Sequence, residues 1–320
     1  MRGICSGRAC TGKSAAVMSE IKAAADRGEG GYILLVPEQY SHEAERELCA
    51  MCGDSLSLYA EVLSFTGLAR RISAELGGLA QAYLDKGGRL LCMALAADGL
   101  YSRLRVYSAA RRRSELQAML LAEIDELKTA CVSSEKLLEA SESCEGALAD
   151  KLHDLGLVLE AYDAVVANGH ADPTDRLTRL ARQIPESSLG RGSHVYVDGF
   201  TDFTAQERRV LEELLLKGVD LTVCLGCDDL KGGSEIFELC RITARTLLAF
   251  AKEKGIETLV RRWEETGSKN AALVYYADNM FSYSSAVYPE SIENISISTA
   301  ADMSAECEFA AARAVELVRE

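Results

Sequence analysis

The first 77 residues alternate short apolar runs with stretches of helical periodicity. The predicted strands are Arg2–Ser6, Gly31–Val36 and Glu61–Ser64, and the helices after them end near Asp26 or span Ser41–Met51 and Phe65–Leu76. The second strand is apolar on both faces, as expected for a strand buried inside a parallel sheet. Strand–helix alternation at this spacing predicts βαβ units and a doubly wound parallel sheet.

The middle of the chain shows helical periodicity only. No proline occurs between Glu38 and Asp172, and from about Gly77 onward Ala, Leu and Glu dominate. Apolar positions recur at helical spacing in two stretches: Leu116, Met119, Leu120, Ile124 and Leu127, then Leu152, Leu155, Leu159, Tyr162 and Val166. We expect an all-α insertion over 78–189, with helix breaks near 87–88, 141–146 and 168–169.

Strand-like and helical stretches alternate again from residue 190. The predicted strands are His194–Asp198, Asp220–Leu225, Ile256–Val260 and Asn294–Ser298, and the predicted helices are Thr204–Leu216, Ser234–Lys254 and Met303–Arg319. The last helix has no Gly or Pro stop, so we expect it to continue into a larger protein. The predicted division is a split α/β core at 1–77 and 190–300, the insertion at 78–189, and a following segment that begins at 301–320.

Composition and charge narrow the class of protein. The 320 residues carry a formal net charge of −14, which repels phosphate and argues against a free-standing nucleic-acid binder. No apolar run approaches the ~18 residues that a membrane span needs, and the first residues lack a secretory apolar region. Eleven cysteines, an odd number, fit reduced thiols better than a disulfide framework. We therefore expect a cytoplasmic protein with no membrane contact.

The strongest motif follows the first predicted strand. It has the pattern G-x-x-x-x-G-K-[ST] and consists of Gly7, Arg8, Ala9, Cys10, Thr11, Gly12, Lys13 and Ser14. The glycines let backbone N–H groups point at phosphates, and the next helix presents its positive end there. Lys13 would neutralise β/γ-phosphate oxygens, and the Ser14 hydroxyl would bind Mg²⁺. The strand–loop–helix context favours an ATP site over a plain Gly-rich turn.

A second candidate for the nucleotide site is the carboxylate at the end of the predicted strand His194–Asp198. An Asp at the end of an apolar strand is where a nucleotide site needs its Mg²⁺ ligand, so Asp198 is the candidate. Helicase-type ATPases commonly place a Glu after this Asp to polarise the attacking water, and here Gly199 cannot do so. We therefore predict nucleotide binding with slow or absent hydrolysis.

Basic residues and cysteines give two further candidate sites. Candidate DNA contacts are Arg103, Arg105, Arg111, Arg112 and Arg113, interleaved with tyrosines, and also Ser64, Thr66 and Arg70. For the first group the alternative is a solvated helix end with salt bridges. The C-x-x-C pairs Cys49/Cys52 and Cys224/Cys227 have the ligands for zinc, but buried free cysteines are the simpler interpretation.

Several stretches, taken in order, resemble the N-terminal part of the AddB family (RexB in some bacteria), the second subunit of AddAB helicase–nucleases. They are the phosphate loop, 33–39 with 44–46, 62–66 with 68–69, 172–175, and 197–204 with 206–207. The sequences Leu-Val-Pro-Glu-Gln and Asp-Gly-Phe-Thr are specific to this family, whereas the phosphate loop is not.

The resemblance implies a superfamily 1 helicase-like fold, in which a RecA-like P-loop core is interrupted by the helical insertion. It implies a subunit that binds ATP without being the motor and helps to hold the processed strand and to recognise the Chi hot-spot in double-strand-break repair by homologous recombination. The expected partner is an AddA-type helicase–nuclease subunit in a heterodimer, with DNA bound through the complex. The exonuclease centre and the cysteines of an iron–sulfur cluster are expected in a C-terminal part outside this sequence.

Two other classes of protein remain open from the residues alone. A P-loop kinase of small molecules would need arginines over the phosphates, and the Arg103–Arg113 patch is the candidate lid. A scaffold with a degenerate phosphate loop would bind no nucleotide and would keep only its association with a motor subunit.

Overall fold

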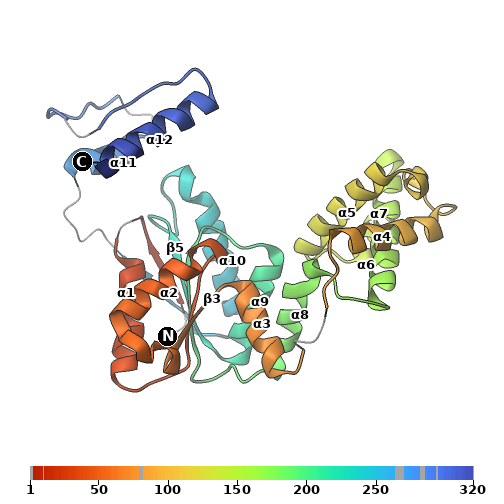
Figure 1. The fold of residues 1–320 in the computed structure, drawn as a ribbon, viewed down its shortest axis with the longest axis horizontal. Helices are drawn as coiled ribbons and strands as arrows, with labels where there is room; N and C mark the ends of the chain where they lie inside the picture. The colour runs from red at the N-terminus through yellow and green to blue at the C-terminus, as the bar shows by residue number, and fades with distance from the viewer. Residues whose placement is uncertain are drawn as a thin grey trace. The chain divides into compact units, whose positions relative to one another are not determined.

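The computed structural model describes residues 3–9, 11–78, 82–263, 270–281, 285–292 and 295–319. The chain divides into two compact units, Met1–Thr266 and Gly267–Glu320. The first unit contains the sheet and the helical insertion, and the second contains two helices (Figure 1).

The first unit is built on a six-stranded parallel sheet. Its strands are β1 (Gly3–Gly7), β2 (Tyr32–Leu35), β3 (Ala60–Leu63), β4 (His194–Phe200), β5 (Asp220–Gly226) and β6 (Leu259–Arg262), in the order β3-β2-β4-β5-β1-β6. All four residues of β2 are buried, which explains its continuous apolar sequence. The predicted fold class, an α/β RecA-like sheet with a large α insertion, is confirmed.

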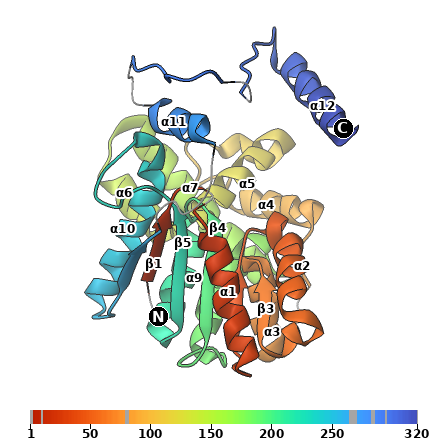
Figure 2. The ribbon, with the colours of Figure 1, turned by 90° about the vertical axis from the view of Figure 1, so that its left-hand side faces the viewer.

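Helices cover both faces of the sheet because the strand order reverses direction. From β1 to β3 the chain moves one way across the sheet, and from β3 to β6 it moves back, so right-handed crossovers put the two sets of helices on opposite faces. One face carries α1 (Lys13–Asp26) and α2 (Ser41–Cys52); the other carries α3 (Phe65–Glu75), α8 (Arg176–Gln183), α9 (Ala205–Lys217) and α10 (Glu238–Glu253). Figure 2 shows α1 crossing in front of the strands. Ligands of open parallel sheets bind where such a reversal leaves a crevice at the carboxyl ends of the strands.

The insertion has its own hydrophobic core. It consists of α4 (Lys86–Leu100), α5 (Ser114–Thr129), α6 (Ser134–Glu142) and α7 (Gly146–Ala167). Met93, Leu120, Ile124 and Val158 are fully buried in it. By contrast, Leu180 of α8 is buried in the core beside the sheet.

The breaks between insertion helices largely follow the predicted positions. Turns separate α6 from α7 and follow α7 at the predicted places. The break expected at 87–88 lies slightly earlier, because the Asp85 carboxylate caps α4 by accepting a hydrogen bond from Gly88 N at 2.7 Å. Both glycines therefore lie in the first turn of the helix.

The second unit differs from the prediction. It contains α11 (Ala271–Asn279) and α12 (Met303–Arg319), and only α12 was predicted. The predicted strand Asn294–Ser298 was wrong for 295–298, the part that the structure describes: these residues form no strand, and Ile297 is 83% exposed. An isolated run of β-forming residues has no ladder partner to stabilise it. In addition, β6 begins three residues later than predicted, where it pairs with β1 from Leu259.

No helix within the described ranges is long and apolar enough to cross a bilayer.

Asp154 of α7 fixes the turn that follows α4. Its carboxylate is fully buried and accepts hydrogen bonds from the backbone N–H groups of Arg105, Val106 and Tyr107 at 2.9, 2.7 and 3.0 Å. Burial raises the pKa of this carboxyl, but the backbone hydrogen bonds outweigh burial and hold the pKa below its usual range.

We expect Asp154 to make the stability of the insertion depend on acid pH. A carboxyl whose pKa is lower in the folded state stabilises the fold above its unfolded pKa of about 4, and this stabilisation is lost as the pH falls through the folded pKa. Chemical denaturation should show Asp154→Asn to be less stable than wild type at pH 7 by about 1.5–3 kcal/mol, with the difference narrowing below pH ~4. Parallel stability–pH curves for the two proteins would contradict this role.

Candidate nucleotide-binding site

The predicted phosphate loop joins the end of β1 to the start of α1. Gly12 is the residue before α1 and has the left-handed conformation φ 84°, ψ 12°. The Thr11 hydroxyl, which is buried, donates to the carbonyl oxygen of Arg8 at 3.0 Å and closes the turn. Ser14 is exposed in the first turn of α1, whereas Cys10 lies outside the described residues. The loop therefore has the glycine geometry and the helix N-terminus that phosphate binding requires.

Lys13 holds the loop together from inside. Its Nζ donates to the carbonyl oxygens of Gly7 and Arg8 at 2.6 and 2.8 Å. Both carbonyls belong to the loop, so the ammonium group already lies where it would meet phosphate oxygens. To bind a phosphate it has to exchange these neutral acceptors for charged ones, which form stronger hydrogen bonds.

Gly7 leaves room for the end of β6. A Cβ at this position would lie 2.7 Å from the carbonyl oxygen of Trp263 and 2.8 Å from Thr11 Oγ1. The backbone of Trp263 is fixed there because its main-chain N–H donates to the carbonyl oxygen of Ser6 at 2.6 Å. Only glycine fits, which gives the first glycine of the motif a packing role that the sequence does not reveal.

Asp198 lies near the carboxyl end of β4, two strands away from Gly7. Strands β1 and β4 both pair with β5, so the two ends are separated by about 10 Å. Cys224 of β5 lies between them: its pKa is raised by its hydrogen bond to Cys5 and by burial, then by the charge of Asp198, while Lys13 lowers it. The carboxylate and the ammonium group therefore both act on the same part of β5, near its carboxyl end.

Gly199 has a backbone conformation that glutamate resists. Its φ is 81°, and the β4–β5 register shifts between Val197 and Phe200. A Cβ at Gly199 would lie 3.2 Å from Pro37 Cδ. The backbone at this position therefore disfavours a glutamate, and the glycine itself carries no carboxylate that could act on water.

Sequence reasoning missed the loop that follows β5. Arg241 of α10 is buried and donates to the carbonyl oxygens of Gly232 and Ser234 at 3.3 and 2.7 Å, and to Asp228 at 3.3 Å. This loop lies beside the phosphate loop, since the Arg8 guanidinium is 5.8 Å from the Phe237 ring centroid. The available signal in the sequence was the pair Asp228 and Asp229, one residue beyond the end of the buried strand β5.

The candidate DNA contacts fall into two places. Ser64 is buried and caps α3, accepting from Gly67 N at 3.1 Å, while Thr66 and Arg70 line a pocket of about 310 Å³ between α3 and the residues Tyr83 and Arg176.

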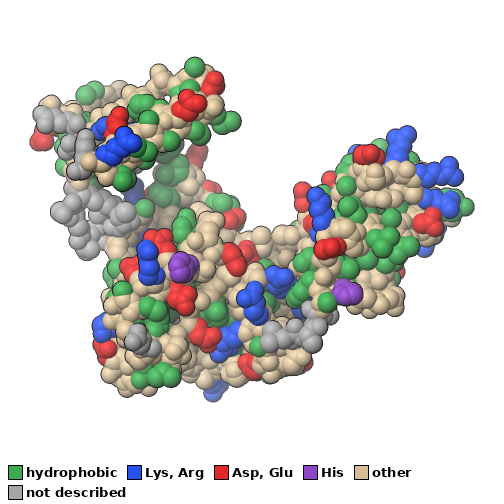
Figure 3. Space-filling model, viewed as in Figure 1, with side chains coloured by type: hydrophobic (Ala, Val, Ile, Leu, Met, Phe, Trp, Pro, Cys, Tyr) green, Lys and Arg blue, Asp and Glu red, His purple; other side chains and the backbone are tan. Residues whose placement is uncertain are grey.

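The second place is the arginine patch, which lies on the insertion after α4 and before α5. Arg105 pairs with Asp150, and Arg111 pairs with Asp98 and lies 4.3 Å from the Tyr101 ring centroid. Arg103, Arg112 and Arg113 are exposed. Basic side chains are visible at this end of the insertion (Figure 3). The salt-bridge interpretation therefore applies to two of the five arginines.

The cysteines form no disulfide framework or metal cluster among the described residues. The ten described cysteines are free thiols, and the same part of the chain contains no group of three or more His, Cys, Asp or Glu side chains that could hold a metal ion. Cys224 and Cys227 are buried in and just after β5, which fits the interpretation as small apolar side chains.

Fold and loop together define a class: a RecA-like α/β unit that carries a phosphate-loop sequence at its switch point and a large helical insertion. The family described as "ADDB, N-terminal" matches residues 4–275, and the chain belongs to this family.

Curated relatives agree, and each of them is named as the B subunit of an ATP-dependent helicase/deoxyribonuclease. The chain is 32% identical to the relative from Thermoanaerobacter sp. (strain X514), 33% to that from Desulforudis audaxviator and 28% to that from Clostridium acetobutylicum, each over 98% of this chain. It spans about 28% of the length of each relative.

Proposed function

We propose that this chain is the nucleotide-binding, helicase-like but non-motor region of the B subunit of an ATP-dependent helicase–exonuclease. ATP would bind at Gly7–Ser14, with Mg²⁺ held by Ser14 and Asp198. The observation that carries this proposal is the left-handed Gly12 between β1 and α1, with Lys13 inside the loop and Asp198 two strands away. Family membership favours this function over that of a small-molecule kinase.

We infer that bound ATP is hydrolysed slowly or not at all. The position after Asp198 is a glycine in a left-handed bulge, so it offers no carboxylate to orient water. The chain would then use ATP to stabilise a conformation, and a partner subunit would do the mechanical work.

The relatives' names support a role within a larger machine. We propose that the partner is an AddA-type helicase–nuclease subunit in a heterodimer, acting in the cytoplasm on broken DNA in double-strand-break repair by homologous recombination. Chi recognition, the nuclease centre and an iron–sulfur cluster would involve residues beyond this chain. Ser64, Thr66, Arg70 and the Arg103–Arg113 patch are the proposed DNA contacts within it.

The proposal is tested by measuring ATP binding and phosphate release on the same protein. We expect Mg·ATP to bind and phosphate release to stay near background, with or without single-stranded DNA. Rapid DNA-stimulated release would contradict a non-motor role, and absence of ATP binding would indicate the scaffold with a degenerate loop.

Gly199→Glu should not create an ATPase. The left-handed backbone costs a non-glycine residue about 1–2 kcal/mol, and the new side chain would press on Pro37. We expect a lower melting temperature and unchanged, near-background phosphate release. Gly218→Ala, which replaces another glycine with positive φ far from this loop, serves as the control for backbone strain alone. A large gain in phosphate release by Gly199→Glu would show that the bulge does not exclude the catalytic geometry.

A further inference from the structure

Two cysteines face each other just before the phosphate loop. Cys5 of β1 and Cys224 of β5 are directly opposite in the register of these neighbouring parallel strands (Figure 2). Both side chains belong to the hydrophobic cluster on the α1 face of the sheet, so they point to the same side. Because Cys5 comes two residues before Gly7, the pair lies at the base of the candidate nucleotide site.

The geometry of this pair permits a disulfide bond. Adjacent strands of a sheet lie about 4.8 Å apart, and disulfides join residues whose Cα atoms are about 4.4–6.8 Å apart. The two side chains already share a hydrogen bond. Oxidation of the pair therefore needs no rearrangement of the fold.

Cys5 is the more acidic thiol of the two. Its hydrogen bond with Cys224 and, to a smaller extent, a hydrogen bond from the Trp263 side chain hold its pKa below the usual value of a thiol, although burial raises it. The thiolate is the form of cysteine that attacks oxidants. Cys224 keeps its proton, because the same hydrogen bond and burial raise its pKa.

Burial of the pair selects a small reagent. Cys5 is 7% exposed and Cys224 is 2% exposed, so another protein's thiol has no access to either sulfur atom. Hydrogen peroxide is little larger than water and needs no such opening. By contrast, Cys49 of α2 is exposed and open to reagents of any size.

A change at Cys5 reaches the phosphate loop through Trp263. The Trp263 side chain hydrogen-bonds to Cys5, and its main-chain N–H donates to the carbonyl oxygen of Ser6 at 2.6 Å. Gly7 is packed so closely between Trp263 and Thr11 that a Cβ would lie 2.7 and 2.8 Å from their oxygen atoms. This packing leaves no slack, so a displacement of the end of β1 moves the loop.

We propose that Cys5 and Cys224 form a peroxide-sensitive dithiol that controls nucleotide binding. The Cys5 thiolate attacks one oxygen of hydrogen peroxide, the O–O bond breaks, and Cys5 becomes a sulfenic acid while the departing hydroxide takes up a proton. Cys224 then attacks the Cys5 sulfur, the S–OH bond breaks, and the hydroxyl leaves as water with the proton of Cys224. Two thiols have lost two electrons to one peroxide, which ends as two waters.

The disulfide should weaken binding of ATP. The new bond draws the two sulfur atoms together and removes the thiolate that accepts the hydrogen bond from Trp263. The loop then loses the support that holds Gly7 in place. This control of binding rests on the proposed nucleotide site, whereas formation of the disulfide does not.

Peptide mapping of the peroxide-treated protein under non-reducing conditions tests the pair without any variant. After alkylation of the remaining thiols, we expect a cross-linked pair of peptides that joins Cys5 to Cys224, is lighter than the two free peptides by two hydrogen atoms, and separates on addition of dithiothreitol. Trp263 is the only tryptophan in the sequence, so quenching of tryptophan fluorescence by the neighbouring disulfide gives the time course.

Mg·ATP titration before oxidation, after oxidation and after reduction connects the pair to the nucleotide site. The affinity of wild type should fall at least ~5-fold on oxidation, the lower end of usual coupling between two sites, and should recover with dithiothreitol. The affinities of Cys5→Ser and Cys224→Ser should not change on peroxide treatment. Cys49→Ser, which removes an exposed thiol, is the matched control and should respond like wild type.

Absence of the cross-link between Cys5 and Cys224 in peroxide-treated wild type would overturn the dithiol site. A cross-link that leaves the ATP affinity unchanged, or an equal effect of peroxide on Cys5→Ser and wild type, would overturn the control of binding. If reduced wild type bound no ATP, the proposed nucleotide site would be refuted together with its control, and the cross-link would still decide whether the dithiol site exists.

Discussion

Lys13→Ala is expected to weaken Mg·ATP binding by about 10- to 150-fold. A hydrogen bond from a charged donor is worth about 1.5–3 kcal/mol, and Lys13 would make several to the β- and γ-phosphates. Because Lys13 also holds the carbonyls of Gly7 and Arg8, the variant loop should lose its closed form as well. Calorimetric titration of ATP, with thermal melting at saturating nucleotide as a second readout, measures both effects.

Lys22→Ala is the matched control for this prediction. Lys22 lies on the same helix, is partly exposed and pairs with Asp26, so its loss removes one positive charge from α1 without touching the loop. It should bind ATP like wild type. Equal affinity of Lys13→Ala and wild type would show that the phosphates bind elsewhere or that the loop is inactive.

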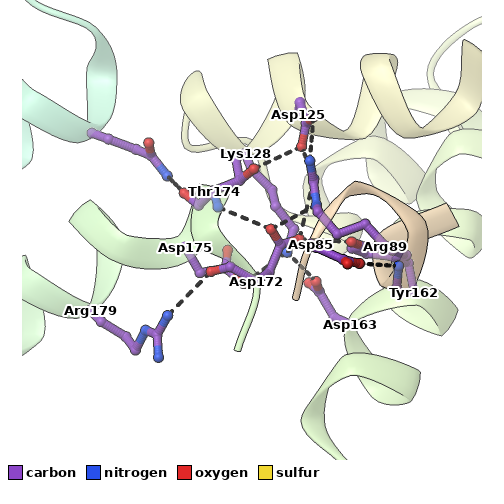
Figure 4. Close-up of polar contacts among 12 residues, drawn as sticks. Asp85, Arg89, Asp125, Lys128, Tyr162, Asp163, Asp172, Thr174, Asp175 and Arg179 are labelled. Atoms are coloured by element: carbon purple, nitrogen blue, oxygen red, sulfur yellow. Dashed lines mark hydrogen bonds and ion pairs between the residues drawn. The ribbon is translucent and has the colours of Figure 1, made fainter. Parts of the chain in front are cut away.

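Asp172→Ala is expected to cause the largest loss of stability in the chain, about 3–5 kcal/mol. Asp172 is the most buried member of an ionic network (Figure 4), and its removal leaves Arg89 and Lys128, which are 13% and 6% exposed, only the more exposed carboxylates of Asp125, Asp163 and Asp175. The Tyr162 hydroxyl and the Thr174 amide also lose their acceptor. Urea denaturation followed by circular dichroism gives the free energy of unfolding.

Asp163→Ala is the control that distinguishes the loss of a buried carboxylate from the loss of a negative charge alone. Asp163 also binds Lys128, at 2.6 Å, but is 52% exposed, so we expect a cost of less than about 1 kcal/mol. If both variants lost the same stability, the buried position of Asp172 would have no special role.

Local pattern was enough to predict most of the sheet. The continuous apolar run of β2 and the strand–loop–helix context of Gly7–Ser14 are signals within a few residues of each other, and both were confirmed as elements. The strand expected at 295–298 had the same local character but lacked a partner, and pairing is a property of distant residues.

The candidate sites also combine features that a local sequence pattern predicts with features that depend on contacts between distant residues. The sequence motif defines the candidate phosphate loop, but the packing of Gly7 against Trp263 joins residues 256 positions apart and is visible only in the structure. The left-handed φ of Gly199 follows from a bulge that only the pairing of β4 with β5 defines. The pocket of about 310 Å³ beside α3 combines residues of α3 with Tyr83 and Arg176, which are far apart in the sequence.

A crystal structure of the protein grown with Mg²⁺ and ATP tests the central claim most directly. We expect an intact triphosphate, with its β- and γ-phosphates on the loop from Gly7 to Ser14 and with Mg²⁺ between Ser14 and Asp198. An empty loop, or a loop that holds only ADP, would contradict an account in which this chain binds ATP and leaves it uncleaved.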